Sequence, residues 1–106
     1  MRAKKPRNSV ERYKPMSEAM FRELGGSNAI KAVEALRVDG GVYWVLIYVR
    51  FNAEPQLLFT TRNHPRVWLS LDRLAAYLEK IWPRCAGFSV VMGKRNTAVP
   101  RVEAGD

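Results

Sequence analysis

The sequence predicts a single α+β domain: a curled antiparallel sheet of four to five strands, with one long amphipathic helix from the C-terminal half packed on one face and a short N-terminal helix. Three observations indicate this class. Residues 71–82 repeat apolar side chains at helical spacing, several shorter apolar runs are bounded by turn residues, and a chain of 106 residues holds one domain. A domain this small buries on the order of 60–65% of its unfolded surface, so we expect a marginally stable monomer or a dimer.

The charges divide the chain into three parts. Residues 1–14 hold six basic residues against Glu11, a net charge of +5, and have few apolar side chains, so we expect a disordered basic tail. Residues 15–93 form the predicted α+β domain, and residues 94–106 form a polar C-terminal tail. The whole chain carries a net charge of +8 and has a pI near 10.2, which favours nucleic acid, an anionic membrane or an acidic protein as partner.

The first predicted helix begins after Ser17. The Ser17 hydroxyl can accept a hydrogen bond from a free backbone N–H of the first turn, and Glu18 suits the positive end of the helix dipole. Met16 and Phe21 have the spacing of a hydrophobic staple. The paired glycines at positions 25 and 26 end this helix.

Two strands joined by a tight turn follow. The Asp-Gly-Gly sequence at residues 39–41 is a strong hairpin turn between residues 30–38 and residues 42–51. The Ala, Lys and Glu content of residues 27–36 also fits a helix, but the turn that follows favours a strand. Residues 42–51 are apolar on both faces, which is typical of a central strand covered on both sides, or of a strand with one face used for dimerisation.

Residues 56–83 form the unit around which the other elements are predicted to pack. Strands at residues 57–62 and 66–69, joined by a turn at residues 63–65, lead directly into a helix. Ser70 is a suitable N-cap, and Leu69 and Leu74 have the spacing of a staple. The apolar residues of this helix share one face: Leu71, Leu74, Ala75, Leu78, Ile81 and Trp82. Pro83 ends the helix near Trp82, and residues 88–92 form a last strand.

The sequence contains no pattern typical of a catalytic or metal site. His64 and Cys85 are the single histidine and cysteine of the chain, and we interpret them as a loop residue and a small residue after a helix. We therefore expect no enzymatic activity, no metal and no cofactor. One cysteine allows no intrachain disulfide, and no apolar run approaches the roughly 20 residues of a membrane span. We expect a cytoplasmic protein without a membrane partner.

Aromatic residues and arginines are interleaved in the middle of the chain, which permits two interpretations. A sheet face of this composition can stack bases and bind phosphate, or the aromatics can be core and the arginines a solvated surface. We favour the core interpretation for Trp44, Phe59 and Trp68. Arg62 and Arg66 flank a turn and are expected to be exposed, so they are the better contact candidates. The candidate nucleic-acid-binding residues are Arg2, Lys4, Lys5, Arg7, Arg12, Lys14, Arg50, Arg62 and Arg66.

Two resemblances involve residues 42–82. A three-stranded sheet followed by an amphipathic helix is similar to the plant AP2 and phage-integrase arm-binding domains, which lay a sheet in the DNA major groove; here only Arg50, Arg62 and Arg66 decorate the strands. The sequences Leu-Phe-Thr-Thr-Arg at 58–62, Pro-Arg-Val-Trp at 65–68 and Ser-Leu-Asp-Arg-Leu at 70–74 resemble ParC-type partition-associated proteins of bacterial plasmids and integrative elements. This second resemblance covers about a quarter of the chain. It implies an accessory role in maintaining a mobile element, without enzymatic activity.

These observations predict a small non-enzymatic accessory protein. It is expected to bind DNA, or a DNA-bound partner such as a partition protein, through phosphate contacts of the basic tail and through Arg62 and Arg66. The alternative is a protein-binding accessory subunit or homodimer that uses an exposed sheet face and makes no direct DNA contact.

Overall fold

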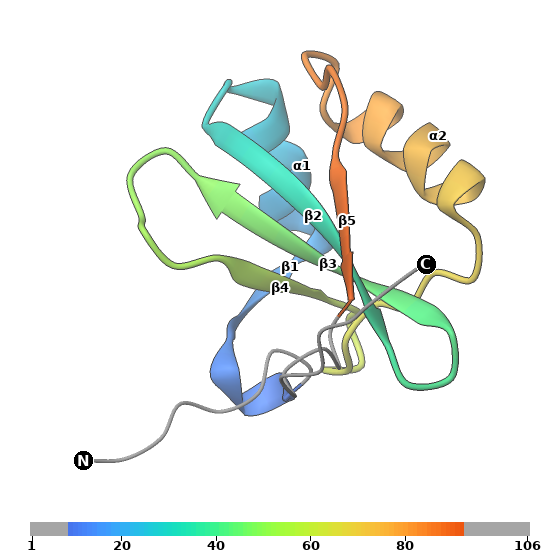
Figure 1. Ribbon diagram of the computed structural model, residues 1–106. Helices are drawn as coiled ribbons and strands as arrows, with labels where there is room; N and C mark the ends of the chain where they lie inside the picture. Colours follow the sequence, from blue (N-terminus) through green and yellow to red (C-terminus); the bar gives the residue numbers. More distant parts are fainter. Residues whose placement is uncertain (1–8, 93–106) are drawn as a thin grey trace.

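A computed structural model describes residues 9–92 as a five-stranded sheet with two helices on one face (Figure 1). In chain order the elements are η1 (Val10–Arg12), β1 (Lys14–Ser17), α1 (Glu18–Gly26), β2 (Ile30–Val38), β3 (Val42–Val49), β4 (Gln56–Phe59), α2 (Leu71–Ile81) and β5 (Ser89–Met92). The predicted α+β class is confirmed. No helix within residues 9–92 combines the length and the apolar character needed to cross a membrane.

The sheet is mixed, so the prediction of an antiparallel sheet is wrong at both edges. The strand order is β1-β4-β3-β2-β5. β3 runs antiparallel to both of its neighbours, whereas β1 is parallel to β4 and β5 is parallel to β2. All strands except β3 therefore point the same way. The edge strands differ from the prediction because each is linked to the rest of the sheet through a helix, which returns the chain in its original direction.

The two helix connections explain why one face of the sheet has both helices. β1-α1-β2 and β4-α2-β5 are crossovers between strands that point the same way, and both move across the sheet in the same direction. Such crossovers are almost always right-handed. Two crossovers of one hand that move the same way place their helices on the same face, as Figure 1 shows for α1 and α2.

Both helices begin at their predicted N-caps. The Ser17 hydroxyl accepts from the Met20 N–H at 3.1 Å, and the Ser70 hydroxyl accepts from the Arg73 N–H at 3.3 Å. The helices then bury their apolar side chains against the sheet. Fully buried members of this core include Phe21, Val33, Val45, Ile47, Leu58, Leu74 and Leu78.

The second helix is shorter than predicted, because α2 spans 11 residues. Its apolar face is the predicted one, and Trp82 is its C-cap. Leu69 is 80% exposed, so the predicted staple between Leu69 and the buried Leu74 does not form.

The first hairpin and the last strand are close to their predicted positions. β2 spans Ile30–Val38, as predicted, and the turn after it places Gly40 and Gly41 at φ values of 91° and 74°. These values favour glycine, which has no Cβ to clash. β5 begins one residue later than predicted, at Ser89.

The two strands on either side of residues 50–55 are shorter than predicted. β3 ends at Val49 and β4 ends at Phe59. The strand predicted at residues 66–69 is absent: this segment contributes only an isolated bridge between Trp68 and Tyr43. Its side chains are held by contacts described below rather than by a strand ladder.

The opposite face of the sheet has no α-helix over it within residues 9–92; only the short 3-10 helix η1 contacts it. We call it the helix-free face; Leu36, Leu46 and Leu57 are fully buried at its centre. Half-buried aromatic side chains pack around these leucines: Tyr13, Trp44, Tyr48 and Phe59. No basic residue occupies a paired strand position on this face, because the cations of the strands alternate to the other side or lie outside the pairings.

The N-terminal prediction differs from the structure at residues 9–14. These residues form η1 and the start of β1, and Val10 and Tyr13 pack against the helix-free face. The apolar side chains of Val10 and Tyr13, together with backbone pairing of β1 to β4, give this segment a place in the fold. The rest of the predicted basic tail, residues 1–8, and the predicted C-terminal tail at residues 94–106 lie outside the described residues.

Candidate nucleic-acid interface

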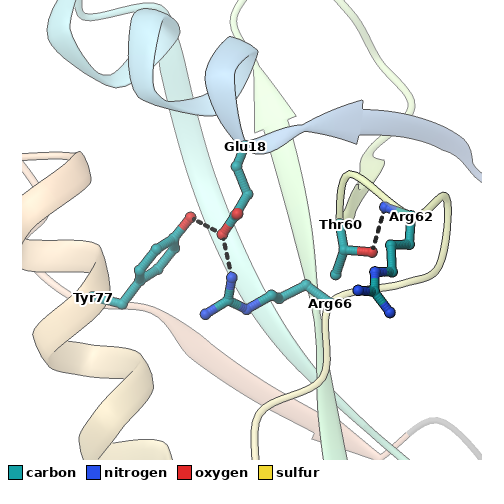
Figure 2. A network of polar contacts seen from close by, with 5 residues as sticks. All are labelled: Glu18, Thr60, Arg62, Arg66 and Tyr77. Atoms are coloured by element: carbon teal, nitrogen blue, oxygen red, sulfur yellow. Dashed lines mark hydrogen bonds and ion pairs between the residues drawn. The ribbon is translucent and has the colours of Figure 1, made fainter.

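Arg62 lies in a turn that is held by several hydrogen bonds, one of which, to Thr60, is drawn in Figure 2. The Thr60 N–H donates to the His64 carbonyl at 2.7 Å, and the Asn63 N–H donates to the Thr60 carbonyl at 3.1 Å. The Arg62 N–H donates to the Thr60 hydroxyl at 3.2 Å, and Asn63 adopts a φ of 67°, which asparagine tolerates better than most residues. The turn therefore holds the backbone of Arg62 in one conformation while the side chain is exposed, as predicted.

Arg66 does not share this exposure, which contradicts the prediction for it. Its Nη1 donates to Glu18 Oε2 at 2.6 Å, and the two side chains are 34% and 25% exposed. The guanidinium carbon lies 4.6 Å from the ring centre of Trp68 and 5.5 Å from that of Tyr77. Arg66 therefore anchors the loop, because its guanidinium group forms an ion pair with the Glu18 carboxylate and packs against two aromatic rings.

Tyr77 completes this network from α2. Its hydroxyl donates to the same Glu18 Oε2 at 2.9 Å, as Figure 2 shows. Burial raises the pKa of Tyr77 well above its ordinary value of 10.0, and the hydrogen bond to the Glu18 carboxylate and the negative charge of that carboxylate raise it further. The Tyr77 ring also lies 4.7 Å from the Trp68 ring, centre to centre. One carboxylate thus joins α1, α2 and the loop between β4 and α2.

Sequence reasoning missed this network. Glu18 is interpreted from the sequence only as a favourable charge at a helix start, and Tyr77 is not singled out. A signal exists for Tyr77, because it follows Leu74 by three residues and so flanks the apolar face of α2. The partner relation to Glu18, 59 residues away, has no local signal.

The core interpretation is confirmed for Trp68, whereas Trp44 and Phe59 are only partly buried. Trp68 is buried at 9% exposure, and its backbone exchanges hydrogen bonds with Tyr43 at 2.8 and 2.9 Å. Trp44 and Phe59 are half-buried on the helix-free face. Within the described residues, none of these three aromatic rings stacks on the guanidinium group of Arg50 or Arg62.

A second group of cations surrounds a hollow at the β2 edge of the sheet. We call it the basic hollow; its cations are Lys31, Arg50 and Arg84, all exposed, and no carboxylate is among its lining residues. The hollow has a volume of about 460 Å³. Arg50 is the sequence-predicted candidate here, and its Nε donates to the Asn28 carbonyl at 2.9 Å. Lys31 and Arg84 were not among the predicted site residues.

Trp82 also lines the basic hollow. Its indole Nε1 is buried and has no hydrogen-bond partner within residues 9–92, which is also true of Trp68 Nε1. A buried donor without an acceptor costs about 1–3 kcal/mol.

Arg12 and Lys14 lie elsewhere, at the β1 edge. They line a hollow of about 520 Å³ together with Glu11 and Glu54, so both signs of charge meet there. The Arg12 guanidinium also lies 5.8 Å from the Tyr13 ring centre. The remaining predicted contact residues, Arg2, Lys4, Lys5 and Arg7, lie outside the described residues.

His64 and Cys85 occupy separate loops. His64 is exposed in the turn before α2, where its carbonyl accepts the Thr60 hydrogen bond. Cys85 is half-buried after α2, and its thiol donates to the Gly87 carbonyl at 3.5 Å. Within residues 9–92 no group of three or more His, Cys, Asp or Glu side chains is arranged to hold a metal ion.

Comparison with known proteins adds no identification, since no protein-family model, curated protein or solved structure matches this chain. The positions of the arginines also bear on the resemblance to AP2 and phage-integrase arm-binding domains, which lay a sheet in the DNA major groove. Arg50 follows the end of β3, Arg62 lies in a turn and Arg66 packs on Glu18, so none of these arginines decorates the helix-free face.

Proposed function

We propose that this protein is a non-enzymatic accessory protein that associates with nucleic acid. The observation that carries the proposal is the presentation of Arg62: an exposed cation on a turn fastened by hydrogen bonds, with Arg66 anchored just beyond it. A cation held in this way loses less conformational freedom on binding than one on a flexible segment. The net charge of +8 supplies the general attraction to phosphate.

In this proposal the predicted contact residues divide into two roles. Arg62 and the N-terminal cations contact the nucleic acid, whereas Arg66 positions the turn through Glu18. The ParC-type resemblance adds a proposed context, the maintenance of a mobile element. A partition protein already bound to DNA remains the proposed protein partner.

The test is a titration of duplex DNA with the full chain, in which binding is measured by fluorescence anisotropy at a series of salt concentrations. Arg62→Ala should reduce the magnitude of the slope of log K against log salt by about 0.9 if Arg62 contacts a phosphate. If it reads a base edge, the loss should be about 1–3 kcal/mol and depend on the DNA sequence. Arg73→Ala is the matched control, because Arg73 is an exposed arginine on α2 away from the turn.

A second variant tests the N-terminal cations. Removal of residues 1–8 deletes Arg2, Lys4, Lys5 and Arg7 but keeps η1 and β1 intact. It should flatten the salt slope by about 3–4 if all four contact phosphates. Full-length protein that shows no DNA binding at low salt would overturn the proposed function.

The helix-free face favours a second candidate, a homodimer. Trp44 and Phe59 are large and half-buried, and no basic residue occupies a paired strand position on this face, which suits an apolar contact better than DNA. A symmetric pair of such faces would bury the aromatic side chains of both copies. Sedimentation at several concentrations tests this: a dimer that Trp44→Glu dissociates and Arg73→Glu does not would support it. A monomer at every concentration would exclude it.

A further inference from the structure

The basic hollow gathers like charges in a way that the fold alone does not require. Lys31 comes from β2, Arg50 follows β3 and Arg84 follows α2, so three separate segments bring their cations to one place. Like charges around a hollow repel one another unless an anion lies between them. No acidic side chain lines this hollow.

The hollow exists because β2 is only partly covered by its edge neighbour. β5 pairs with β2 from Glu34 to Arg37, and the chain between Pro83 and Phe88 forms no strand. The first half of β2, from Ile30 to Val33, therefore has no strand partner on that side within the described residues. Backbone donors at an unpaired strand edge are available to a ligand.

Arg50 is held in a suitable orientation. The hydrogen bond from its Nε to the Asn28 carbonyl fixes one side of the guanidinium group, and its backbone N–H donates to the Ala29 carbonyl at 2.9 Å. The terminal nitrogens of a guanidinium fixed in this way can present paired donors to oxygen atoms. Trp82 lines the same wall, but its indole Nε1 is buried, so its N–H resonance serves as a nearby reporter rather than as a phosphate ligand.

Helix dipoles account for part of this charge but not for all of it. Asn28 follows the C-terminal end of α1, and Trp82 caps that of α2, so two helix ends with negative partial charge lie at the hollow. Each end is equivalent to about half a negative charge. Three cations against two such ends leave a surplus of about +2.

We propose that the basic hollow is a phosphate-binding site, in which Arg50 and Arg84 contact the phosphate oxygens and Lys31 adds a neighbouring charge. The phosphate belongs either to a nucleic-acid backbone or to a free phosphorylated molecule. The site is separate from the Arg62 turn, so it does not rest on the proposed function. A free phosphate would occupy it even in a protein that binds no DNA.

The test is a titration of the full chain with inorganic phosphate at constant ionic strength. Binding is observed through the NMR chemical shifts of the backbone and indole N–H groups. Saturable shifts are expected for Arg50, Arg84 and the Trp82 indole, and chloride should not reproduce them. Arg50→Gln with Arg84→Gln should weaken phosphate binding at least tenfold. Arg73→Gln with Arg22→Gln is the matched control, because it removes the same charge from exposed positions of α2 and α1 that do not line the hollow.

A single variant and a stability measurement distinguish loss of the site from loss of the fold. Arg84→Gln alone should still weaken binding, and it leaves the Arg50–Asn28 hydrogen bond in place should the double variant fold poorly. Thermal unfolding shows whether the cations serve only the helix ends: a lower melting temperature with unchanged phosphate affinity would overturn the proposal. Shifts that follow ionic strength alone, or equal losses in the control pair, would also overturn it.

The source of the phosphate is then read from an oligonucleotide titration of the same variants. If the hollow binds nucleic acid, the double variant should lose affinity for duplex or single-stranded DNA beyond the loss seen in the control pair. If only inorganic phosphate binding is lost, the natural ligand is a free phosphorylated molecule. DNA binding by the full chain without phosphate shifts at the hollow would leave the proposed function standing and refute this site.

Discussion

Arg66→Ala is expected to destabilise the fold, whereas Arg62→Ala is expected to leave its stability nearly unchanged. The two arginines are four residues apart and flank the same turn. Arg66 contacts Glu18 and the Trp68 ring, while the side chain of Arg62 makes no hydrogen bond or ion pair with the described residues. Figure 2 shows the difference: a dashed line joins the Arg66 guanidinium to Glu18, whereas the only line from Arg62 joins its backbone N–H to Thr60.

The magnitude follows from the contacts of Arg66. A hydrogen bond to a charged group contributes about 1.5–3 kcal/mol when buried. Because the Arg66 and Glu18 side chains are 34% and 25% exposed, solvent screening reduces this value, and we take about 1 kcal/mol. The cation–π contact with Trp68 adds about 0.5–1 kcal/mol. With some loss of packing by the Arg66 stem, the expected cost is about 2 kcal/mol.

Urea and thermal unfolding, followed by tryptophan fluorescence, measure this cost. For a domain of this size about 2 kcal/mol lowers the melting temperature by about 8–16 °C. Arg62→Ala should change the free energy of unfolding by no more than about 0.5 kcal/mol, as at most exposed sites. A double-mutant cycle with Glu18→Gln isolates the pairwise coupling. Equal stabilities of the Arg66→Ala and Arg62→Ala proteins would refute the anchoring role of Arg66.

Two other predictions concern the helices. Gly25→Ala should lower the free energy of unfolding by about 1–3 kcal/mol, because the added Cβ would overlap the Ile81 carbonyl. Gly26→Ala is the control, since nothing lies near its added Cβ. Equal thermal stability of the two variants would contradict the close approach of α1 to α2. The raised pKa of Tyr77 keeps its phenol neutral in the fold, while the unfolded chain loses this proton near the ordinary pKa of 10.0. Its contribution to stability should therefore be complete below about pH 10 and decline above it by up to about 1.4 kcal/mol per pH unit. Urea unfolding from pH 9 to 11 checks this, and a decline just as steep in Tyr77→Phe would show that other groups cause it.

The parts of the fold that sequence predicts well are those whose causes are local. Ser17 and Ser70 cap their helices within three residues, and the glycines after Asp39 form the hairpin turn from their own backbone preference. The apolar face of α2 repeats at a helical period, so it is readable without knowledge of its partners.

The parts that sequence does not predict depend on residues far apart. β1 has a single buried side chain, Met16, and includes Pro15, so it shows no alternating pattern. It is a strand because it pairs with β4, about 40 residues later in the chain. The role of Arg66 likewise depends on Glu18, 48 residues away, and an arginine beside a turn is by itself more typical of an exposed surface.

The topology separates the two kinds of surface that the proposals use. Because both crossovers place their helices on one face, the other face keeps Trp44 and its aromatic neighbours only partly buried, with no cation at a paired position. The candidate contact cations of the proposals lie instead beyond the strand ends, with Arg62 in the turn after β4 and Arg50 after β3. Contacts on separate surfaces should contribute independently. Trp44→Glu is therefore expected to change self-association without altering the effect of Arg62→Ala on the salt slope of a single bound copy. A strong dependence of one effect on the other would mean that the nucleic acid binds across two copies, with the helix-free faces joining them.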